Sequence, residues 1–184
     1  MTATITLPGI TGSGEAHWQT LWEARDPRMV RFQPASWDHP DLSDWVAALN
    51  CTISAAPEPP LLVAHSLACL LVAHWAVREV KGTEQLVRGA FLVAAPDPDS
   101  PAFPLEAATF RDVPEMGLPF PALVVASADD PYATLDHARR CSSAWGAGFV
   151  VVGALGHINS ASRLGDWPQG AMLLEAFRAG TARL

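Results

Sequence analysis

The stretch that decides the fold is Leu61-Leu62-Val63-Ala64-His65-Ser66-Leu67-Ala68. It joins a short apolar run to a longer one that continues to residue 80. The short run has the length of a strand, and the long run is apolar nearly all round, which favours a deeply buried helix. A serine at such a corner is held out from the sheet edge, and the free N–H groups that begin the helix point to the same place. We therefore expect a strand over 61–64, a corner at Ser66 and a helix over 67–80.

This corner has the features of a nucleophile elbow, a sharp strand-to-helix turn that presents a serine. The usual pattern is G-x-S-x-G, and here alanine stands at both glycine positions, Ala64 and Ala68. Each alanine adds one methyl group beside a serine held at strained backbone angles. We expect the corner to form with slightly opened helix–strand packing and with Ser66 exposed. The alanines bear more on catalytic power than on the fold.

Five other apolar runs of strand length alternate with helical patterns. Most are apolar at both alternating positions, which is typical of parallel strands covered on both faces. The predicted strands are 4–7, 29–33, 61–64, 87–94, 122–126 and 149–152, and the predicted helices are 15–24, 41–53, 67–80, 132–145 and 170–178. This alternation predicts an α/β fold, a three-layer sandwich around a mostly parallel sheet of about six strands.

Length and composition fit one domain over residues 1–184. Hydrophobic residues make up 49% and charged residues 17%, which is typical of a globular protein with a buried core. A net charge of −7 argues against nucleic acid and anionic membranes as partners. No apolar stretch is long enough to span a bilayer, and a signal-peptide pattern is lacking. Cys51, Cys69 and Cys141 lack the spacing of a metal or disulfide framework, so we expect a reduced, cytoplasmic protein without a metal.

Residues 96–121 interrupt the alternation with seven of the sixteen prolines. Proline at that density blocks regular helices and central strands. The segment is either an ordered surface loop or a small lid whose apolar side chains cover the site, and the sequence does not choose between the two.

Three chemically useful side chains follow predicted strands. A serine hydroxyl is a weak nucleophile, which needs a base and a third group to orient that base. Ser66 follows the third strand, Asp130 the fifth and His157 the sixth. Because the carboxyl ends of parallel strands meet at one edge of a sheet, we expect these side chains to converge. Serine, acid, histidine is also the chain order of α/β-hydrolases. The order predicts Ser66 as nucleophile, His157 as base and Asp130 as the orienting acid.

Other acids compete for the orienting role. Asp129 neighbours Asp130, but Pro131 fixes the turn directly after Asp130 and favours the latter. Asp97 follows the fourth strand and is the alternative, because its loop could also reach the histidine.

The remaining histidines fit the base less well. His74 and His137 lie inside predicted helices, where a structural role is expected. His17 and His39 precede the serine and do not fit the order, although His17 could line the pocket. The side chain of His65 should diverge from that of its neighbour, the serine, and we place it in the pocket wall.

An oxyanion requires two backbone N–H donors. Leu67, directly after the serine, should supply one. The loop over residues 7–14 should supply the other from Gly9 or Ile10, because its glycines allow the backbone to approach a ligand closely. Read alone, this loop could be a phosphate-binding turn of a flavodoxin-like nucleotide or flavin binder. It matches neither the Walker A pattern nor G-x-G-x-x-G, so we rank that hypothesis lower.

Four short motifs together resemble a known family. They are Leu7-Pro8-Gly9 with Gly12-Ser13-Gly14 and His17-Trp18, then Ala64-His65-Ser66-Leu67, Asp129-Asp130-Pro131-Tyr132 and Gly156-His157-Ile158-Asn159. The chain resembles the small bacterial serine hydrolases of the α/β-hydrolase superfamily that are related to retinoblastoma-binding protein 9 and to the YdeN-like proteins. The resemblance implies a compact α/β-hydrolase fold without a large cap domain and a triad at Ser66, Asp130 and His157. It also implies a structural or pocket-lining role for His17 and Trp18.

The leading hypothesis is a serine hydrolase of the carboxylesterase type, which forms an acyl-serine intermediate from a small ester-like substrate without a cofactor. The alternative is a catalytically weak protein of the same fold that acts as a binding module, for which the two alanines at the corner are the support. The sequence does not separate esters from thioesters, amides or lactones. A homodimer is compatible with the sequence, which leaves the oligomeric state open.

Overall fold

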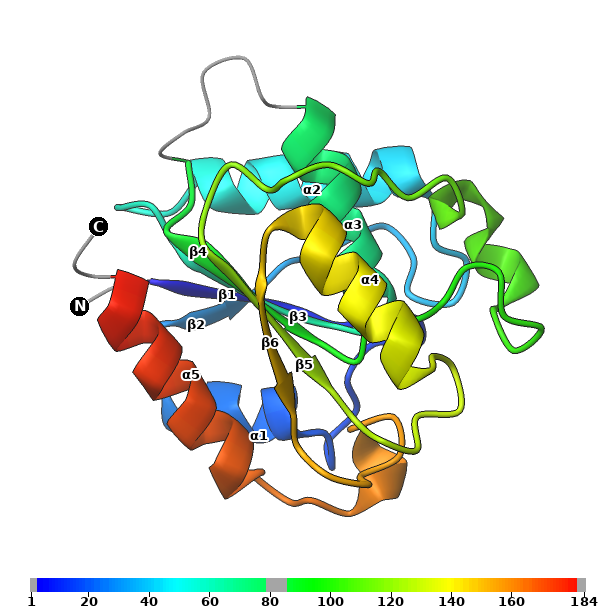
Figure 1. Ribbon diagram of the computed structural model, residues 1–184. Helices are drawn as coiled ribbons and strands as arrows, with labels where there is room; N and C mark the ends of the chain where they lie inside the picture. Colours follow the sequence, from blue (N-terminus) through cyan, green and yellow to red (C-terminus); the bar gives the residue numbers. More distant parts are fainter. Residues whose placement is uncertain (1–2, 79–85, 182–184) are drawn as a thin grey trace.

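The computed structural model describes residues 3–78 and 86–181, and within them six strands form one parallel sheet in the order β2-β1-β3-β4-β5-β6 (Figure 1). The strands are β1 (Thr4–Leu7), β2 (Met29–Arg31), β3 (Leu61–His65), β4 (Gly89–Val93), β5 (Ala122–Ala126) and β6 (Gly148–Val151). The helices are α1 (Trp18–Arg25), α2 (Leu42–Ser54), α3 (Leu67–Arg78), α4 (Leu135–Trp145) and α5 (Pro168–Thr181), with short 3-10 helices η1 (Leu105–Phe110) and η2 (Ser160–Ser162).

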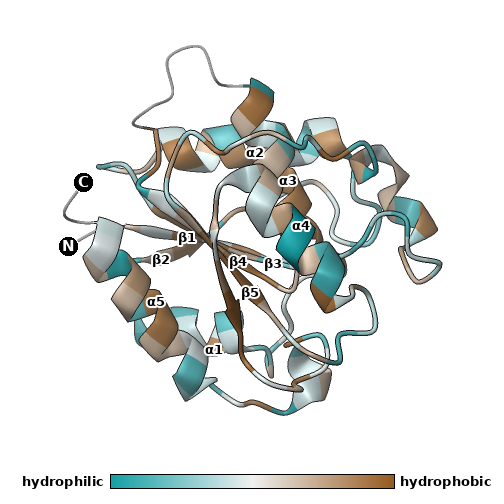
Figure 2. Ribbon diagram, in the orientation of Figure 1, coloured by the Kyte–Doolittle hydropathy of each residue, from teal (hydrophilic) through white to brown (hydrophobic). Residues whose placement is uncertain are grey.

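Helices cover both faces of the sheet, α2, α3 and α4 on one and α1 and α5 on the other (Figure 1). Successive side chains of a strand point to opposite faces of the sheet. In β3, Leu62 and Ala64 pack in the hydrophobic cluster under α2 and α3, whereas Leu61 and Val63 pack in the one under α1 and α5. Figure 2 shows hydrophobic residues concentrated in the central strands. The predicted three-layer α/β sandwich is confirmed.

Helix boundaries differ from the predictions where side chains cap the first turn. The ring of His17 accepts the Gln19 N–H, so α1 begins at residue 18 rather than 15. The Thr134 hydroxyl accepts the His137 N–H, so α4 begins at 135 rather than 132. Helix α5 extends past both predicted ends, 170 and 178. The predicted helix over 67–80 forms through Arg78, and its last two residues lie outside the described ranges.

Strand lengths differ in smaller ways. Strand β2 ends at Arg31, two residues short of the predicted end, although the Phe32 N–H still donates to Thr6 O of β1. Strand β4 is shorter than predicted at both ends, β3 includes His65, and β6 is shifted by one residue toward the N-terminus.

The proline-rich segment over residues 96–121 is built into the molecule. Phe110 is fully buried in the cluster beneath α2 and α3, and η1 forms between the prolines. Pro96, Phe103 and Pro104 line the cavity that contains Ser66. The segment therefore combines features of both hypotheses: part of it is an ordered core element, and part of it is a wall of the site.

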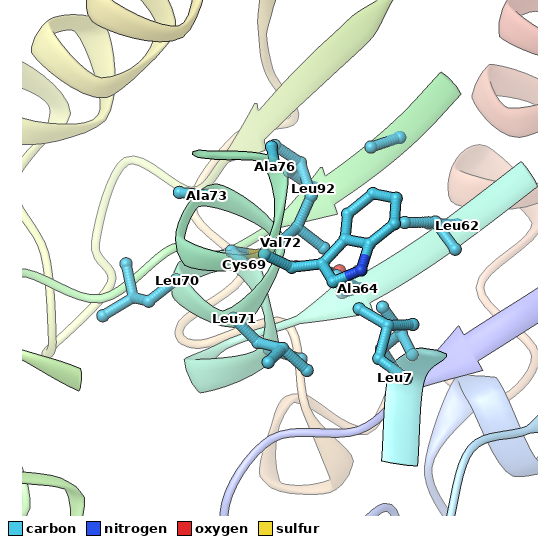
Figure 3. Packing of buried hydrophobic residues seen from close by; sticks show 14 of the residues in the cluster. Leu7, Leu62, Ala64, Cys69, Leu70, Leu71, Val72, Ala73, Ala76 and Leu92 are labelled. Atoms are coloured by element: carbon cyan, nitrogen blue, oxygen red, sulfur yellow. Dashed lines mark hydrogen bonds between the residues drawn. The ribbon is translucent and has the colours of Figure 1, made fainter. Parts of the chain in front are cut away.

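The strand-to-helix corner rests on the most buried part of the core. Every residue from Leu67 to Ala76 is buried, as the all-round apolar pattern predicted. Figure 3 shows Ala64 beneath α3, among Leu7, Leu62 and Leu92 of the three central strands. Both corner alanines, Ala64 and Ala68, have zero exposure.

Candidate active site

Ser66 occupies the corner between β3 and α3. Its φ is +55°, in the left-handed region that a non-glycine residue adopts only under constraint. Two backbone hydrogen bonds supply that constraint: the Ser66 N–H donates to Val93 O at 2.9 Å, and the Cys69 N–H donates to Ser66 O at 2.8 Å. The expectation of an exposed serine was wrong, because loops pack over the corner and leave Ser66 only 9% exposed.

Ser66, His157 and Asp130 come together at the carboxyl edge of the sheet. The distance from His157 Nε2 to Ser66 Oγ is 2.8 Å, and Asp130 Oδ1 and Oδ2 lie 2.9 and 3.0 Å from His157 Nδ1. A carboxylate can only accept hydrogen bonds, so Nδ1 carries the ring proton and Nε2 is left to accept the proton of the serine hydroxyl. The side chain of Asp130 is 3% exposed, which protects this pairing from water.

A polar network positions the loop that carries His157. The Ser127 hydroxyl donates to Asp129 Oδ1 at 2.8 Å and accepts the Leu155 N–H at 2.8 Å. The same Asp129 oxygen accepts the Gly156 N–H at 2.7 Å. These two hydrogen bonds lower the pKa of Asp129, so it stays ionised as an anchor for the loop. Asp129 therefore differs from its neighbour Asp130 in role as well as in partner.

Asp97, the alternative acid, lies elsewhere. Its Oδ2 is 3.4 Å from Nδ1 of His137 on α4, and Cys141 Sγ is 3.2 Å from the other nitrogen of that ring. Burial raises the pKa of the Cys141 thiol to about 12 and lowers that of His137. This second arrangement resembles a nucleophile–base–acid set in its contacts, but the raised pKa favours the protonated thiol over the nucleophilic thiolate.

The predicted oxyanion donors flank Ser66. Leu67 is the first residue of α3, where a backbone N–H has no partner inside the helix. In the loop after β1, the Thr11 N–H donates to Trp37 O and the Gly12 N–H to Gly9 O, which leaves the predicted donors Gly9 and Ile10. A Cβ on Gly9 would lie only 3.3 Å from the Leu67 N atom, so the two segments of backbone are in close approach.

Two further imidazoles stand beside His157. His65 Nε2 lies 2.9 Å from the carbonyl oxygen of His157, to which it donates, and the two rings are 5.0 Å apart. His17 contacts His65 edge-on, with ring centroids 4.7 Å apart. Burial lowers the pKa of His17 to about 4, with a further contribution from the positive charge of Arg31. Burial likewise lowers the pKa of His65 well below its ordinary value, so both rings are neutral near pH 7.

A cavity of about 540 Å³ contains Ser66 and His157. His17 and His65 line it as predicted, but Trp18 does not. Trp18 is buried behind this wall, and its indole N–H donates to Ile158 O at 2.8 Å. The lining residues are Gly9, Ile10, Thr11, Gly12, Gly14, His17, His65, Ser66, Leu67, Pro96, Phe103, Pro104, Tyr132, His157, Asn159, Ser160 and Ala161.

Two residues of the cavity wall, Tyr132 and Asn159, belong to the sequence motifs described above, but no role in the site was predicted for them. The ring of Tyr132 lies 4.5 Å from that of His157, and Asn159 caps η2 through its side chain. Their position close to Asp130 and His157 in the sequence is the signal that could have predicted their place in the cavity wall. Phe103 has no such signal, because its place depends on the path of the proline-rich segment.

Within residues 3–78 and 86–181, no group of three or more His, Cys, Asp or Glu side chains is placed to hold a metal ion. No helix in the same ranges combines the length and apolarity needed to cross a membrane.

The model of the serine hydrolase family matches residues 4–176, nearly the whole chain. The chain belongs to the serine hydrolase family. A comparison with curated proteins found no significant match.

Solved structures agree with this family assignment. The hydrolase is similar to a YdeN-like hydrolase from Pectobacterium atrosepticum, with a TM-score of 0.86 and 29% identity over 98% of this chain and 92% of that chain. It is also similar to the ydeN gene product from B. subtilis, with a TM-score of 0.76 and 19% identity over 97% and 100% of the two chains. The esterase domain of a Rhodothermus marinus protein matches with a TM-score of 0.62 and 19% identity over 96% and 87%, which shows a shared fold.

Proposed function

We propose that this serine hydrolase cleaves carboxylic esters through an acyl-serine intermediate, with Ser66 as nucleophile, His157 as general base and acid, and Asp130 as the group that orients His157. The observation that carries the proposal is the pair of contacts made by His157, 2.8 Å from Nε2 to Ser66 Oγ and 2.9 Å from Nδ1 to Asp130 Oδ1. Both distances are within hydrogen-bond reach, and the acceptor-only carboxylate sets the ring tautomer that the reaction requires.

The proposed reaction proceeds in two halves. Ser66 Oγ attacks the carbonyl carbon while its proton moves to His157 Nε2, and the N–H groups of Leu67 and Ile10 bind the oxyanion that forms. The imidazolium then gives that proton to the leaving alcohol oxygen, and the acyl group remains on Ser66. In the second half, His157 takes a proton from water while the water oxygen bonds to the acyl carbon. The imidazolium then gives that proton to Ser66 Oγ as the bond between Oγ and the acyl carbon breaks, which releases the carboxylic acid and restores the serine.

The test is labelling of the native protein with a fluorophosphonate probe, together with turnover of para-nitrophenyl butyrate. Wild type should be labelled and Ser66→Ala should not. Asp130→Asn should lower kcat by about 10⁴-fold, because the amide favours the wrong ring tautomer. Asp97→Asn is the matched control, since Asp97 faces His137, and it should stay within a few-fold of wild type.

A binding module is the competing function, and the alanines at positions 64 and 68 are the observation that favours it. It predicts weak labelling and no ester turnover above the Ser66→Ala background. Equal labelling of wild type and Ser66→Ala would remove Ser66 from the proposal altogether.

A further inference from the structure

The cavity around Ser66 is lined without a single formally charged side chain. Among the described residues that form its wall, none is Asp, Glu, Lys or Arg. Apolar groups make up one part of the wall, notably Phe103 and Pro104, and neutral polar groups such as Thr11 and Asn159 make up another. Any ionic group on a ligand would therefore enter a site that offers it no counter-charge.

The two histidines that border the site do not alter this balance. The Nδ1 atom of His17 accepts the Gln19 N–H at 3.2 Å, so that nitrogen is unprotonated. Burial lowers the pKa of His17 to about 4 and that of His65 well below its ordinary value. The carboxylate of Asp130 lies behind His157, 3% exposed and paired with the ring. The reacting groups thus face a wall that is electrically neutral before the reaction begins.

Charged side chains gather instead around a second, smaller cavity of about 190 Å³ between the proline-rich segment and α4. Its lining includes the charged residues Asp97, Asp99, Arg111, Glu115 and Arg140. The difference between the two cavities shows that neutrality is a property of the Ser66 site and not of the whole surface. The net charge of −7 adds a long-range repulsion for anions.

We propose that the Ser66 site takes an uncharged ester, one with no carboxylate, phosphate or ammonium group on the part of the molecule that enters the cavity. This inference rests on the proposed function and narrows it to a substrate class. A charged group in the cavity would lose its hydration without gaining an ion pair, and an anion would in addition be repelled by the protein's own charge. The neutral polar groups of the wall can still bind ether, hydroxyl or carbonyl oxygens.

The test compares three para-nitrophenyl esters that share a six-carbon acyl chain. They are the hexanoate, the adipate monoester with a terminal carboxylate, and the ester with a terminal trimethylammonium group. For wild type, kcat/KM for the hexanoate should exceed that for each charged ester by at least about tenfold. The anionic ester should be the poorest, and its disadvantage relative to the cationic ester should shrink as salt is added.

A matched pair of variants at the cavity rim tests the cause. Ala161 is exposed, lies in η2 and lines the cavity, so a longer side chain can reach over the opening. Ala161→Lys should raise the ratio of kcat/KM for the anionic ester to that for the hexanoate by about tenfold, because it supplies the missing counter-charge. Ala161→Gln, which is of similar length and neutral, should leave that ratio unchanged.

The outcomes separate the two proposals. Equal kcat/KM for the neutral and anionic esters in wild type would overturn the substrate class while leaving ester hydrolysis intact. An equal rise of the ratio in Ala161→Lys and Ala161→Gln would show that charge is not the cause. Absence of turnover for all three esters, with no fluorophosphonate labelling of Ser66, would instead refute the proposed function.

Discussion

Gly9 is the position where one added methyl group should do the most damage to the site. A Cβ there would lie 2.8 Å from Ser66 Cβ, 3.1 Å from His65 O and 3.3 Å from Leu67 N. Real Cβ atoms essentially never approach another heavy atom within 3.0 Å, and each of these neighbours is held by the corner itself. Gly9→Ala must therefore push the loop after β1 away from Ser66.

The size of the effect follows from what is displaced. Overpacking in a well-packed region costs about 1–3 kcal/mol. In a chain of this length that cost lowers Tm by roughly 2–12 °C. Displacement of the loop should also withdraw the Ile10 N–H from the proposed oxyanion site, and loss of one such donor reduces kcat by about 10²–10³-fold. The fold should survive, whereas turnover should nearly vanish.

The assay measures para-nitrophenyl butyrate turnover, fluorophosphonate labelling and thermal unfolding on the same preparation. Gly117→Ala is the matched control, because Gly117 is exposed and a Cβ there would meet no atom within 4 Å. The control should turn over like wild type. A Gly9→Ala protein with wild-type kcat and Tm would refute both the close approach and the role given to this loop.

Three further perturbations give distinct outcomes. The pKa of His17 falls from 6.5 to about 4 on folding, so the unfolded chain binds a proton first as the pH drops. The free energy of unfolding should therefore fall by about 3 kcal/mol between pH 6.5 and 4. In denaturant titrations at both pH values, His17→Asn, which keeps a capping acceptor, should show a smaller fall. Native protein should show one fast thiol toward an aromatic disulfide reagent, the exposed Cys51, while Cys141, whose pKa is raised to about 12, reacts only after unfolding. Ser127→Ala removes the acceptor of the Leu155 N–H, so it should cost about 1–3 kcal/mol by denaturant titration and lower kcat as well.

Much of the fold could be predicted because its strands carry an unusually plain signal. Runs that are apolar at both alternating positions are typical of parallel strands with helices on both sides; most of the six predicted strands have this pattern, and all six form strands. Ser66, Asp130 and His157 could be placed at one edge because each lies in the connection after the carboxyl end of a parallel strand. Strand order and chain direction placed the three side chains at one edge, and the turn fixed by Pro131 favoured Asp130 as the acid.

Other features depend on packing that no local pattern encodes. The start of α1 was misplaced because histidine is an unusual cap, and only the fold brings the ring of His17 to the Gln19 N–H. Asp97 follows a strand as Asp130 does, yet the path of its loop carries it to His137. The burial of Ser66 depends on loops from distant parts of the chain that meet above the corner.

The two alanines at the corner illustrate why a mismatch to G-x-S-x-G need not disturb the site. Only Ser66 has a positive φ within this motif, so neither Ala64 nor Ala68 occupies a backbone conformation that requires glycine. Both methyl groups lie in the core with zero exposure, away from the cavity wall. The close approach to the serine is made from the opposite side, by Gly9. The steric demand on the site therefore falls at position 9, and we expect Gly9→Ala to impair turnover far more than any alanine-to-glycine change at the corner improves it.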